Sequence, residues 1–170
     1  MEEENRVVLS LGGNLGDRVA FLRDAIQLLE IEFNTSLIVS SFYETVPWGF
    51  ESEDLFLNCC AYFSTSKSPQ EVLQITKKVE KELGRVKKSQ NNIYNSRVID
   101  IDILYHGERI VQDENLRVPH PLLYDRSFVL VPLAEILPAM LIQPFSRICA
   151  SKSIIPLPQM PTGFLFPMVV

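Results

Sequence analysis

Cysteine is scarce in this 170-residue chain, which has three, and no two of them are spaced as Cys-x-x-Cys. Cys59 and Cys60 are adjacent, whereas Cys149 lies far away in the sequence. An odd number without a paired motif favours small buried thiols in a reducing compartment over a disulfide framework.

Long apolar runs are also lacking, and so is an excess of positive charge. No stretch reaches the roughly 18 consecutive apolar residues of a membrane-spanning helix, and the first residues, Met1-Glu2-Glu3-Glu4, are unlike a signal peptide. We therefore expect a cytoplasmic protein that does not bind membranes. The net charge of -5 and the pI near 5.1 disfavour a general nucleic-acid surface, which needs a basic field.

The chain length and a hydrophobic share of 46% predict one domain with a substantial core. We place this domain at residues 1–140 and expect an irregular, proline-containing C-terminal extension at 141–170, with one short strand near Leu141. Apolar periodicity and the helix start Ser68-Pro69-Gln70-Glu71 predict strands and helices in the order β-α-β-β-α-β. This order predicts an α+β, ferredoxin-like core, in which helices pack on one face of an antiparallel sheet.

The expected strands cover residues 7–11, 37–45, 56–63, 97–105 and 109–111. The expected helices follow the turn at 12–17, begin at Ser68, and run from about Arg126 to Ile136.

The segment from Arg97 to Tyr105 has two acids inside an apolar, β-branched run. Side chains alternate along a strand, so Asp100 and Asp102 share one face. Their Cα atoms would lie roughly 6.5 to 7 Å apart, close enough to ligate one Mg²⁺ or a closely spaced pair. Oxygen ligands without nearby Cys or His favour Mg²⁺ or Mn²⁺, whose remaining ligands are water and substrate phosphates. The segment therefore indicates a nucleotide site, and an acidic edge strand that resists aggregation is the alternative.

Three further features accompany this strand. The glycine-rich turn at 12–16 has neither a Walker A nor a Rossmann pattern, so it predicts turn geometry rather than a phosphate cradle. Trp48, in a Pro- and Gly-containing loop, either caps the core or forms one wall of a pocket for a flat ring. Asn58 is the one amide in its strand and needs partners from the backbone or from a ligand.

Together the motifs resemble those of the 6-hydroxymethyl-7,8-dihydropterin pyrophosphokinase family over about residues 6–138. The resemblance is carried by Gly84-Arg85-Val86-Lys87, by Arg97-x-x-Asp100-x-Asp102-Ile103-Leu104, and by Val118-Pro119-His120 with Arg126 six residues later. It implies a folate-pathway transferase that moves the β,γ-diphosphate of ATP onto the hydroxymethyl group of the pterin and releases AMP. It also implies two Mg²⁺ ions and ATP as cosubstrate, and we expect a monomer.

The resemblance assigns three groups of residues. Catalytic roles fall to Arg85, Arg97, Asp100 and Asp102, and the two aspartates also hold the metal. The implied ATP ligands are Glu80, Arg85, Lys87, Arg97, Ile103, His120 and Arg126. The implied pterin pocket consists of Thr45, Pro47, Trp48, Gly49, Phe56, Asn58 and Phe128.

The basic segment between Arg85 and Arg97 departs from the family pattern. Asn95-Ser96 stands where the family usually has Gly-Pro, and the segment is longer than usual, so either Ile93 or Tyr94 takes the place of the family's tryptophan. Lys87 stands where Arg is common, which keeps the charge but loses a bidentate fork.

Two other functions remain open from the sequence. A ferredoxin-like RNA-binding module would carry paired aromatic residues within a basic signature, which this chain lacks. A different Mg²⁺-dependent nucleotidyl transferase could use the same pair of aspartates, but it would release pyrophosphate instead of AMP.

Overall fold

The computed structural model describes residues 5–49, 53–84, 96–136 and 164–168. Its elements run in the order β1 (Asn5–Gly13), α1 (Arg18–Phe33), β2 (Ile38–Val39), β3 (Phe42–Thr45), β4 (Phe56–Thr65), α2 (Pro69–Glu82), β5 (Asp100–His106), β6 (Val111–Gln112), β7 (Arg117–Val118), a short 3-10 helix (Leu123–Asp125), α3 (Ser127–Ile136) and β8 (Phe164–Met168).

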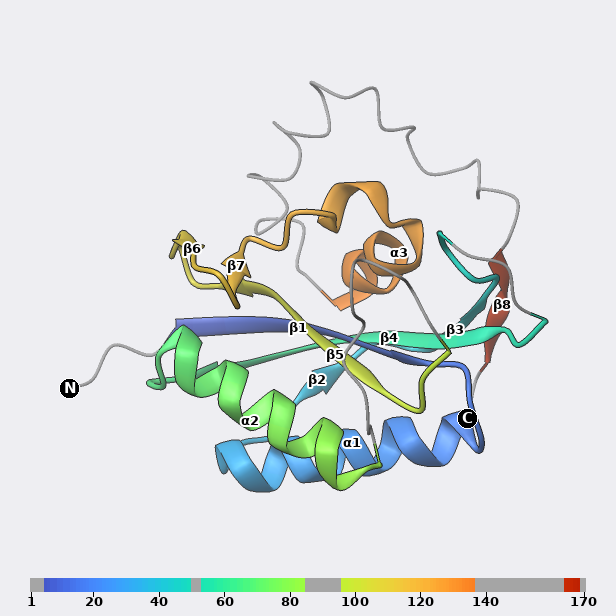
Figure 1. Cartoon of the computed structure of the whole chain (residues 1–170), viewed down its shortest axis with the longest axis horizontal. Coiled ribbons are helices and arrows are strands. Elements are labelled where there is room, and N and C mark those ends of the chain that lie inside the picture. The colour runs from blue at the N-terminus through green and yellow to red at the C-terminus, as the bar shows by residue number, and fades with distance from the viewer. Residues whose placement is uncertain (1–4, 50–52, 85–95, 137–163, 169–170) are drawn as a thin grey trace.

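An antiparallel sheet forms the centre of the molecule (Figure 1). Its strand order is β5-β1-β4-β3-β8, with β2 also paired to β4, while β6 and β7 form a separate two-stranded ribbon. All the strand pairs of the described residues are antiparallel. The predicted α+β class and antiparallel sheet are confirmed.

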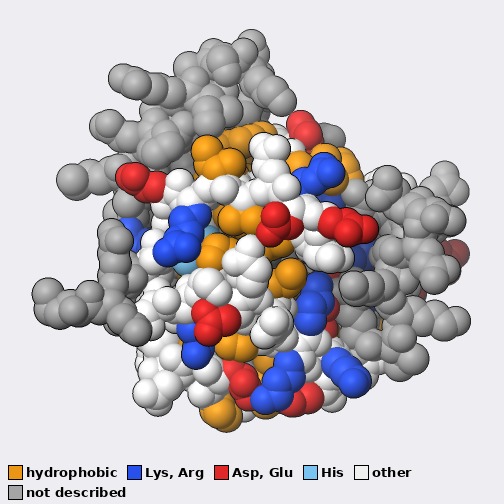
Figure 2. Space-filling model, turned by 60° about the vertical axis from the view of Figure 1, so that its left-hand side comes forward, with side chains coloured by type: hydrophobic (Ala, Val, Ile, Leu, Met, Phe, Trp, Pro, Cys, Tyr) orange, Lys and Arg blue, Asp and Glu red, His pale blue; other side chains and the backbone are white. Residues whose placement is uncertain are grey.

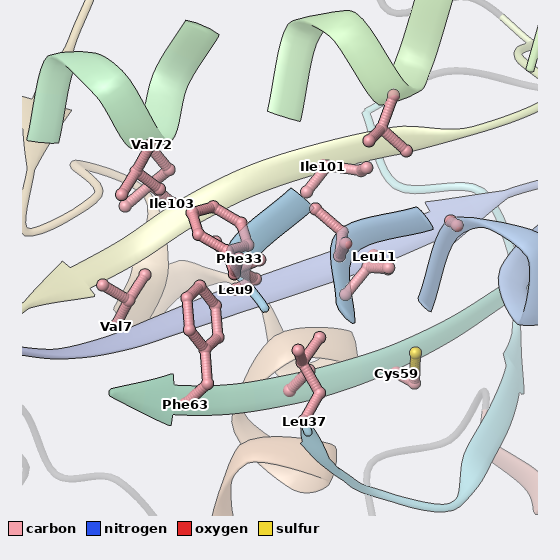
Figure 3. Packing of buried hydrophobic residues seen from close by; sticks show 14 of the residues in the cluster. Val7, Leu9, Leu11, Phe33, Leu37, Cys59, Phe63, Val72, Ile101 and Ile103 are labelled. Atoms are coloured by element: carbon pink, nitrogen blue, oxygen red, sulfur yellow. The ribbon is translucent and has the colours of Figure 1, made fainter. Parts of the chain in front are cut away.

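Helices cover both faces of this sheet (Figure 1). α1 and α2 bury Leu29 and Val72 against β1, β4 and β5, and Figure 3 shows this cluster closing around Leu9 and Ile101. α3 packs on the opposite face over a second cluster that includes Leu133. The sequence analysis placed the helices on one face; the second layer exists because α3 is almost entirely apolar and needs a sheet face of its own.

Local signals account for both long helices. Ser68 and Glu71 form the predicted capping box, in which the Ser68 hydroxyl accepts from the Glu71 amide and the Glu71 carboxylate accepts from the Ser68 amide. Asp17 caps α1 by accepting from the Ala20 amide at 3.0 Å.

The predicted strand at 37–45 is broken into β2 and β3. Ser40 causes the break, because its hydroxyl accepts from the Cys60 amide at 3.0 Å and so replaces a backbone carbonyl in the ladder. The strand predicted at 109–111 is shifted to Val111–Gln112, and Ile110 is 77% exposed. The short strand expected near residue 141 lies outside the described residues.

The positions of the cysteines and of the charged side chains (Figure 2) agree with what the composition predicts. Cys59 and Cys60 are buried thiols, as expected, one in each core cluster. On the face shown in Figure 2, basic and acidic side chains are interspersed. In the part of the chain that the structure describes, no helix is long and apolar enough to cross a membrane.

Candidate active site

An open pocket of about 530 Å³, part of it open to solvent, lies where β1, β4 and β5 meet the start of α3. It brings together nine of the residues singled out from the sequence: Thr45, Trp48, Phe56, Asn58, Arg97, Asp100, Asp102, Arg126 and Phe128. Ser10, Gly12 and Val46 also line it and were not predicted.

The two aspartates project from β5 into this pocket. Their neighbours Ile101 and Ile103 are buried in the core on the other face, so the strand alternates as expected. The Arg97 guanidinium pairs with Asp100. Arg126 Nη1 donates to Asp102 Oδ2 at 3.2 Å.

Burial and neighbouring charges act on Asp102 in opposite directions. Burial and the nearby Asp100 raise the pKa of Asp102, while His120 and the positive charges of Arg126 and Lys77 oppose this shift. His120 Nε2 lies 3.8 Å from the Asp102 carboxylate, and burial lowers the pKa of the imidazole although that carboxylate pulls it upward. Two carboxylates side by side on one face of β5 form a site that a cation would stabilise.

Helix α2 holds the outer edge of β5. Glu80 is 2% exposed, and its carboxylate accepts from the Ile101 amide at 2.7 Å and from Lys77 Nζ at 2.9 Å. The accepted amide lies between the two aspartates in sequence. Glu80 therefore fixes the backbone segment that carries Asp100 and Asp102. This hydrogen bond to the Ile101 amide was not predicted from the sequence.

The glycine-rich segment of β1 has a role beyond the predicted turn. Of the glycines at 12, 13 and 16, only Gly16, which follows β1, adopts the left-handed conformation of a turn, with φ of 66°. At Gly13 a Cβ would lie 2.2 Å from the Val98 carbonyl oxygen, so β1 and the segment before β5 touch backbone to backbone.

Asn14 reinforces this contact by hydrogen bonding to the Arg97 backbone. Its side-chain oxygen accepts from the Arg97 amide at 2.8 Å, its own amide donates to the Arg97 carbonyl at 2.9 Å, and its Nδ2 donates to Ser96 Oγ. Asn14 is 4% exposed. We call these three hydrogen bonds the Asn14 clamp. The Gly-Gly-Asn run marks its position in the sequence, but no local pattern identifies Arg97 as the partner of Asn14.

Aromatic rings line the same pocket as the aspartates. The Trp48 and Phe128 ring centroids lie 6.4 Å apart, and the Arg126 guanidinium lies over both rings, at 5.3 Å and 5.7 Å. Asn58 is buried below, and its Nδ2 donates to Thr45 Oγ1 at 2.8 Å. Trp48 thus lines the pocket, one of the two placements that the sequence left open.

The remaining sequence-based candidates are more dispersed. Pro47 and Gly49 flank Trp48 outside the lining, and the Ile103 side chain lies in the core. Arg85, Lys87, Ile93 and Tyr94 lie outside the described residues.

Among the described residues that line the pocket, the aspartate pair is the donor set suited to a hard metal ion. Across residues 5–49, 53–84, 96–136 and 164–168, no group of three or more His, Cys, Asp or Glu side chains is arranged to hold a metal ion. Two hard oxygen donors leave most coordination positions of a Mg²⁺ to water and substrate, which is how this ion is commonly held.

Paired carboxylates beside arginines, in one pocket with aromatic rings, suit the transfer of a charged group to a flat acceptor, which is the chemistry of a transferase. The model of the family described as 7,8-dihydro-6-hydroxymethylpterin-pyrophosphokinase (HPPK) matches residues 8–138. The chain belongs to this family.

Two relatives illustrate the similarity. The 2-amino-4-hydroxy-6-hydroxymethyldihydropteridine pyrophosphokinase of Porphyromonas gingivalis is 46% identical over 133 residues, which are 78% of this chain and 90% of that protein. The Bacillus subtilis protein of the same name is 42% identical over 133 residues, 78% of each chain.

Solved structures agree on the fold. Plasmodium falciparum HPPK-DHPS A437G/K540E, crystallised with pterin and p-hydroxybenzoate, matches with a TM-score of 0.59 at 15% identity. The match covers 89% of this chain and 45% of that one, so this chain spans less than half the length of that structure.

Proposed function

We propose that this chain transfers the pyrophosphoryl group of ATP to 6-hydroxymethyl-7,8-dihydropterin, giving the pterin diphosphate and AMP in folate biosynthesis. The observation that carries the proposal is a single pocket that Asp100 and Asp102 line together with the Trp48 and Phe128 rings. A polyanion and a flat heterocycle can meet there. Membership of the pyrophosphokinase family supports the same reaction.

The aspartate side of the pocket would hold Mg²⁺, and we propose two ions. The donor set fits, because both ligands are hard oxygens on one strand, and because burial and the nearby Asp100 raise the pKa of Asp102, an effect that a bound cation would oppose. When bound, the ions would neutralise and align the triphosphate.

Around the metal site, this chain's own cations would orient the phosphates. Arg97 and Arg126 already sit beside the two aspartates, and guanidinium forks match phosphate oxygens. His120, whose Nε2 lies 3.8 Å from the Asp102 carboxylate, would add a further donor. Arg85 and Lys87, assigned through the family resemblance, would add positive charge, and Arg85 and Arg97 are proposed as catalytic with the two aspartates.

Glu80 and Ile103 complete the proposed ATP side through the backbone of β5. Glu80 occupies the outward-facing amide of Ile101. Ile103 lies two residues further along this edge strand, so its backbone is directed to the same outer side, where a purine edge could pair with it.

The opposite side of the pocket would bind the pterin. Phe56 and Phe128 would contact the flat faces of the ring, and the Asn58 amide, oriented by Thr45, would pair with its polar edge. Trp48, with Pro47 and Gly49 beside it, would close the rim. The pterin hydroxyl oxygen would then attack the β-phosphorus and lose its proton to solvent, the bond from that phosphorus to the α,β-bridging oxygen would break, and AMP would leave with that oxygen.

The strand order supports the finer topology as well. Taking β2 and β3 as one broken strand, the core order β5-β1-β4-β3 is the 4-1-3-2 order of a ferredoxin-like β-α-β-β-α-β domain. We propose residues 1–140 as the catalytic domain and 141–170 as an extension, in a monomeric cytoplasmic enzyme.

Product analysis of paired variants tests this proposal. Wild-type protein with Mg²⁺, ATP and the hydroxymethyl pterin should form AMP in step with the pterin diphosphate. Asp100→Asn and Asp102→Asn should each lose activity by about 100-fold or more, since each removes charge from the metal site. The control is Asp113→Asn, which changes an exposed carboxylate that only accepts from Gln70. Near-normal turnover of both site variants would contradict the two-carboxylate site.

A further inference from the structure

We propose that Arg18 is a positioning residue that closes the base of the pterin-side loop. This inference rests on the proposed function. Arg18 lines no part of the pocket and was not among the candidates from the sequence. Its guanidinium joins the two stems of the connection between β3 and β4, which carries Trp48.

The geometry is a bridge between the two ends of one loop. Arg18 Nη2 forms an ion pair with Glu44 Oε2 at 2.7 Å, and Arg18 Nη1 donates to the Leu55 carbonyl at 2.8 Å. Glu44 directly precedes Thr45, and Leu55 directly precedes Phe56. One guanidinium therefore fixes the last residues of the framework on both sides of the loop.

These two anchors lead directly to the proposed pterin contacts. Thr45 and Phe56 are paired across β3 and β4, and Thr45 accepts the Asn58 hydrogen bond that orients this amide. If the stems separate, Phe56 and Asn58 move relative to one another, and Trp48 loses its fixed support. The expected consequence is weaker pterin binding, with the phosphate side unaffected.

An arginine is suited to this place for a physical reason. The guanidinium is planar and carries several N–H donors in fixed directions, so one side chain can serve a carboxylate and a carbonyl at once. Lysine would retain the charge but would offer its donors from a single nitrogen. The Arg18 and Glu44 side chains are 27% and 20% exposed, so solvent screening is only partial.

The position of Arg18 on the chain favours the same role. It is the first residue of α1, and Asp17 caps that helix through the Ala20 amide. The guanidinium therefore projects from a fixed helix start toward the loop. Because Arg18 extends from a capped helix, its guanidinium can hold Glu44 and Leu55 in fixed positions, which makes it a positioning contact.

The test compares Arg18→Ala, Arg18→Lys and Glu44→Gln with wild type. Lys78→Ala serves as the matched control, since Lys78 forms an ion pair of the same length, 2.7 Å, with Glu32, between α1 and α2 and away from the pocket. Each variant is assayed for KM of both substrates, for kcat, and for pterin affinity. Trp48 is the only tryptophan, so its fluorescence reports the loop directly.

Arg18→Ala should raise the KM and the Kd for the pterin about tenfold, the effect of losing one charge-assisted contact of about 1.4 kcal/mol. The KM for ATP should stay within about twofold, and the Trp48 emission should shift to longer wavelength as the ring becomes more exposed. For Arg18→Lys and Glu44→Gln, the pterin affinity and the Trp48 emission should lie between those of wild type and Arg18→Ala. Lys78→Ala should match wild type in both.

Two results would overturn the inference. One is unchanged pterin affinity and Trp48 emission in Arg18→Ala while wild type turns over, which leaves the proposed function intact. The other is an equal change in Lys78→Ala, which would show a general loss of stability. A wild type without pterin-dependent turnover would instead refute the proposed function, and Trp48 emission alone would then decide whether Arg18 fixes the loop.

Discussion

Replacing Gly13 by alanine should reduce catalysis far more than it reduces stability. Gly13 lies in β1, where the backbone runs against the segment that leads into β5. A Cβ here would lie 2.2 Å from the Val98 carbonyl oxygen and 2.9 Å from the Val98 carbonyl carbon. Both obstacles are backbone atoms, so no side-chain rotation can relieve the overlap.

The size of the effect follows from this overlap. Ordinary contact begins at 3.4 Å, so one of the two backbones must retreat by about 1 Å, a misplacement that can cost about 100-fold in rate. The displaced segment carries Arg97, which pairs with Asp100, and leads into the strand with both aspartates. Overpacking of this kind destabilises the fold by about 1–3 kcal/mol.

Steady-state kinetics and thermal unfolding of two variants separate these effects. Gly107→Ala is the control, because Gly107 follows the far end of β5, has φ of 54°, and would place a Cβ 2.6 Å from the Asn5 side chain. Both variants should lose stability, but only Gly13→Ala should lose about 100-fold in kcat. A folded Gly13→Ala enzyme with wild-type kcat, or an equal loss of kcat in Gly107→Ala, would refute the reasoning.

Three further substitutions have definite expectations. Leu29→Ala removes a fully buried side chain of α1 and should cost about 2–5 kcal/mol in urea unfolding; less than about 1 kcal/mol would contradict the packing. Burial raises the pKa of Glu135. Hydrogen bonds from the Ser41 amide and from the Tyr43 and Ser41 hydroxyls outweigh burial and lower this pKa below its ordinary value of 4.5. The stability advantage of wild type over Glu135→Gln should therefore be complete above pH 4.5 and disappear as pH falls through the lowered value, and an advantage that grows in acid would be inconsistent with this sign. Asn58→Leu removes the amide that Thr45 orients, so calorimetry should show weaker pterin binding at unchanged ATP affinity; equal losses for both would refute a specific role.

Much of the fold was predictable because its signals are local. The capping box of α2 joins Ser68 to Glu71, three residues apart, and the apolar stripe after it has helical spacing. The alternation that buries Ile101 in the core and turns the half-buried aspartates to the other face is likewise a property of neighbouring residues. Such patterns are readable without knowing what lies across the sheet.

The break between β2 and β3 was not readable, because distant partners cause it. Ser40 bonds to Cys60, and the freed Ser41 amide donates to Glu135 at 2.9 Å, from a residue 94 positions away. No pattern within residues 37–45 carries this information.

The candidate site shows the same division. Strand alternation was enough to pair Asp100 with Asp102, and nine of the residues singled out from the sequence line one pocket. The Asn14 clamp on Arg97 and the Arg18 bridge to Leu55 join residues 83 and 37 positions apart. Polar residues at turns and helix starts have many local explanations, so only the tertiary structure identifies these partners.

The central claim is that a diphosphoryl group, and not a single phosphate or a nucleotide, moves to the pterin. The most direct measurement follows ³²P from ATP labelled at the α- or the β-phosphorus, with Mg²⁺ and the hydroxymethyl pterin. The β-label should appear in the pterin product and the α-label only in AMP. A β-label retained on ADP, or an α-label on the pterin with release of pyrophosphate, would contradict the account.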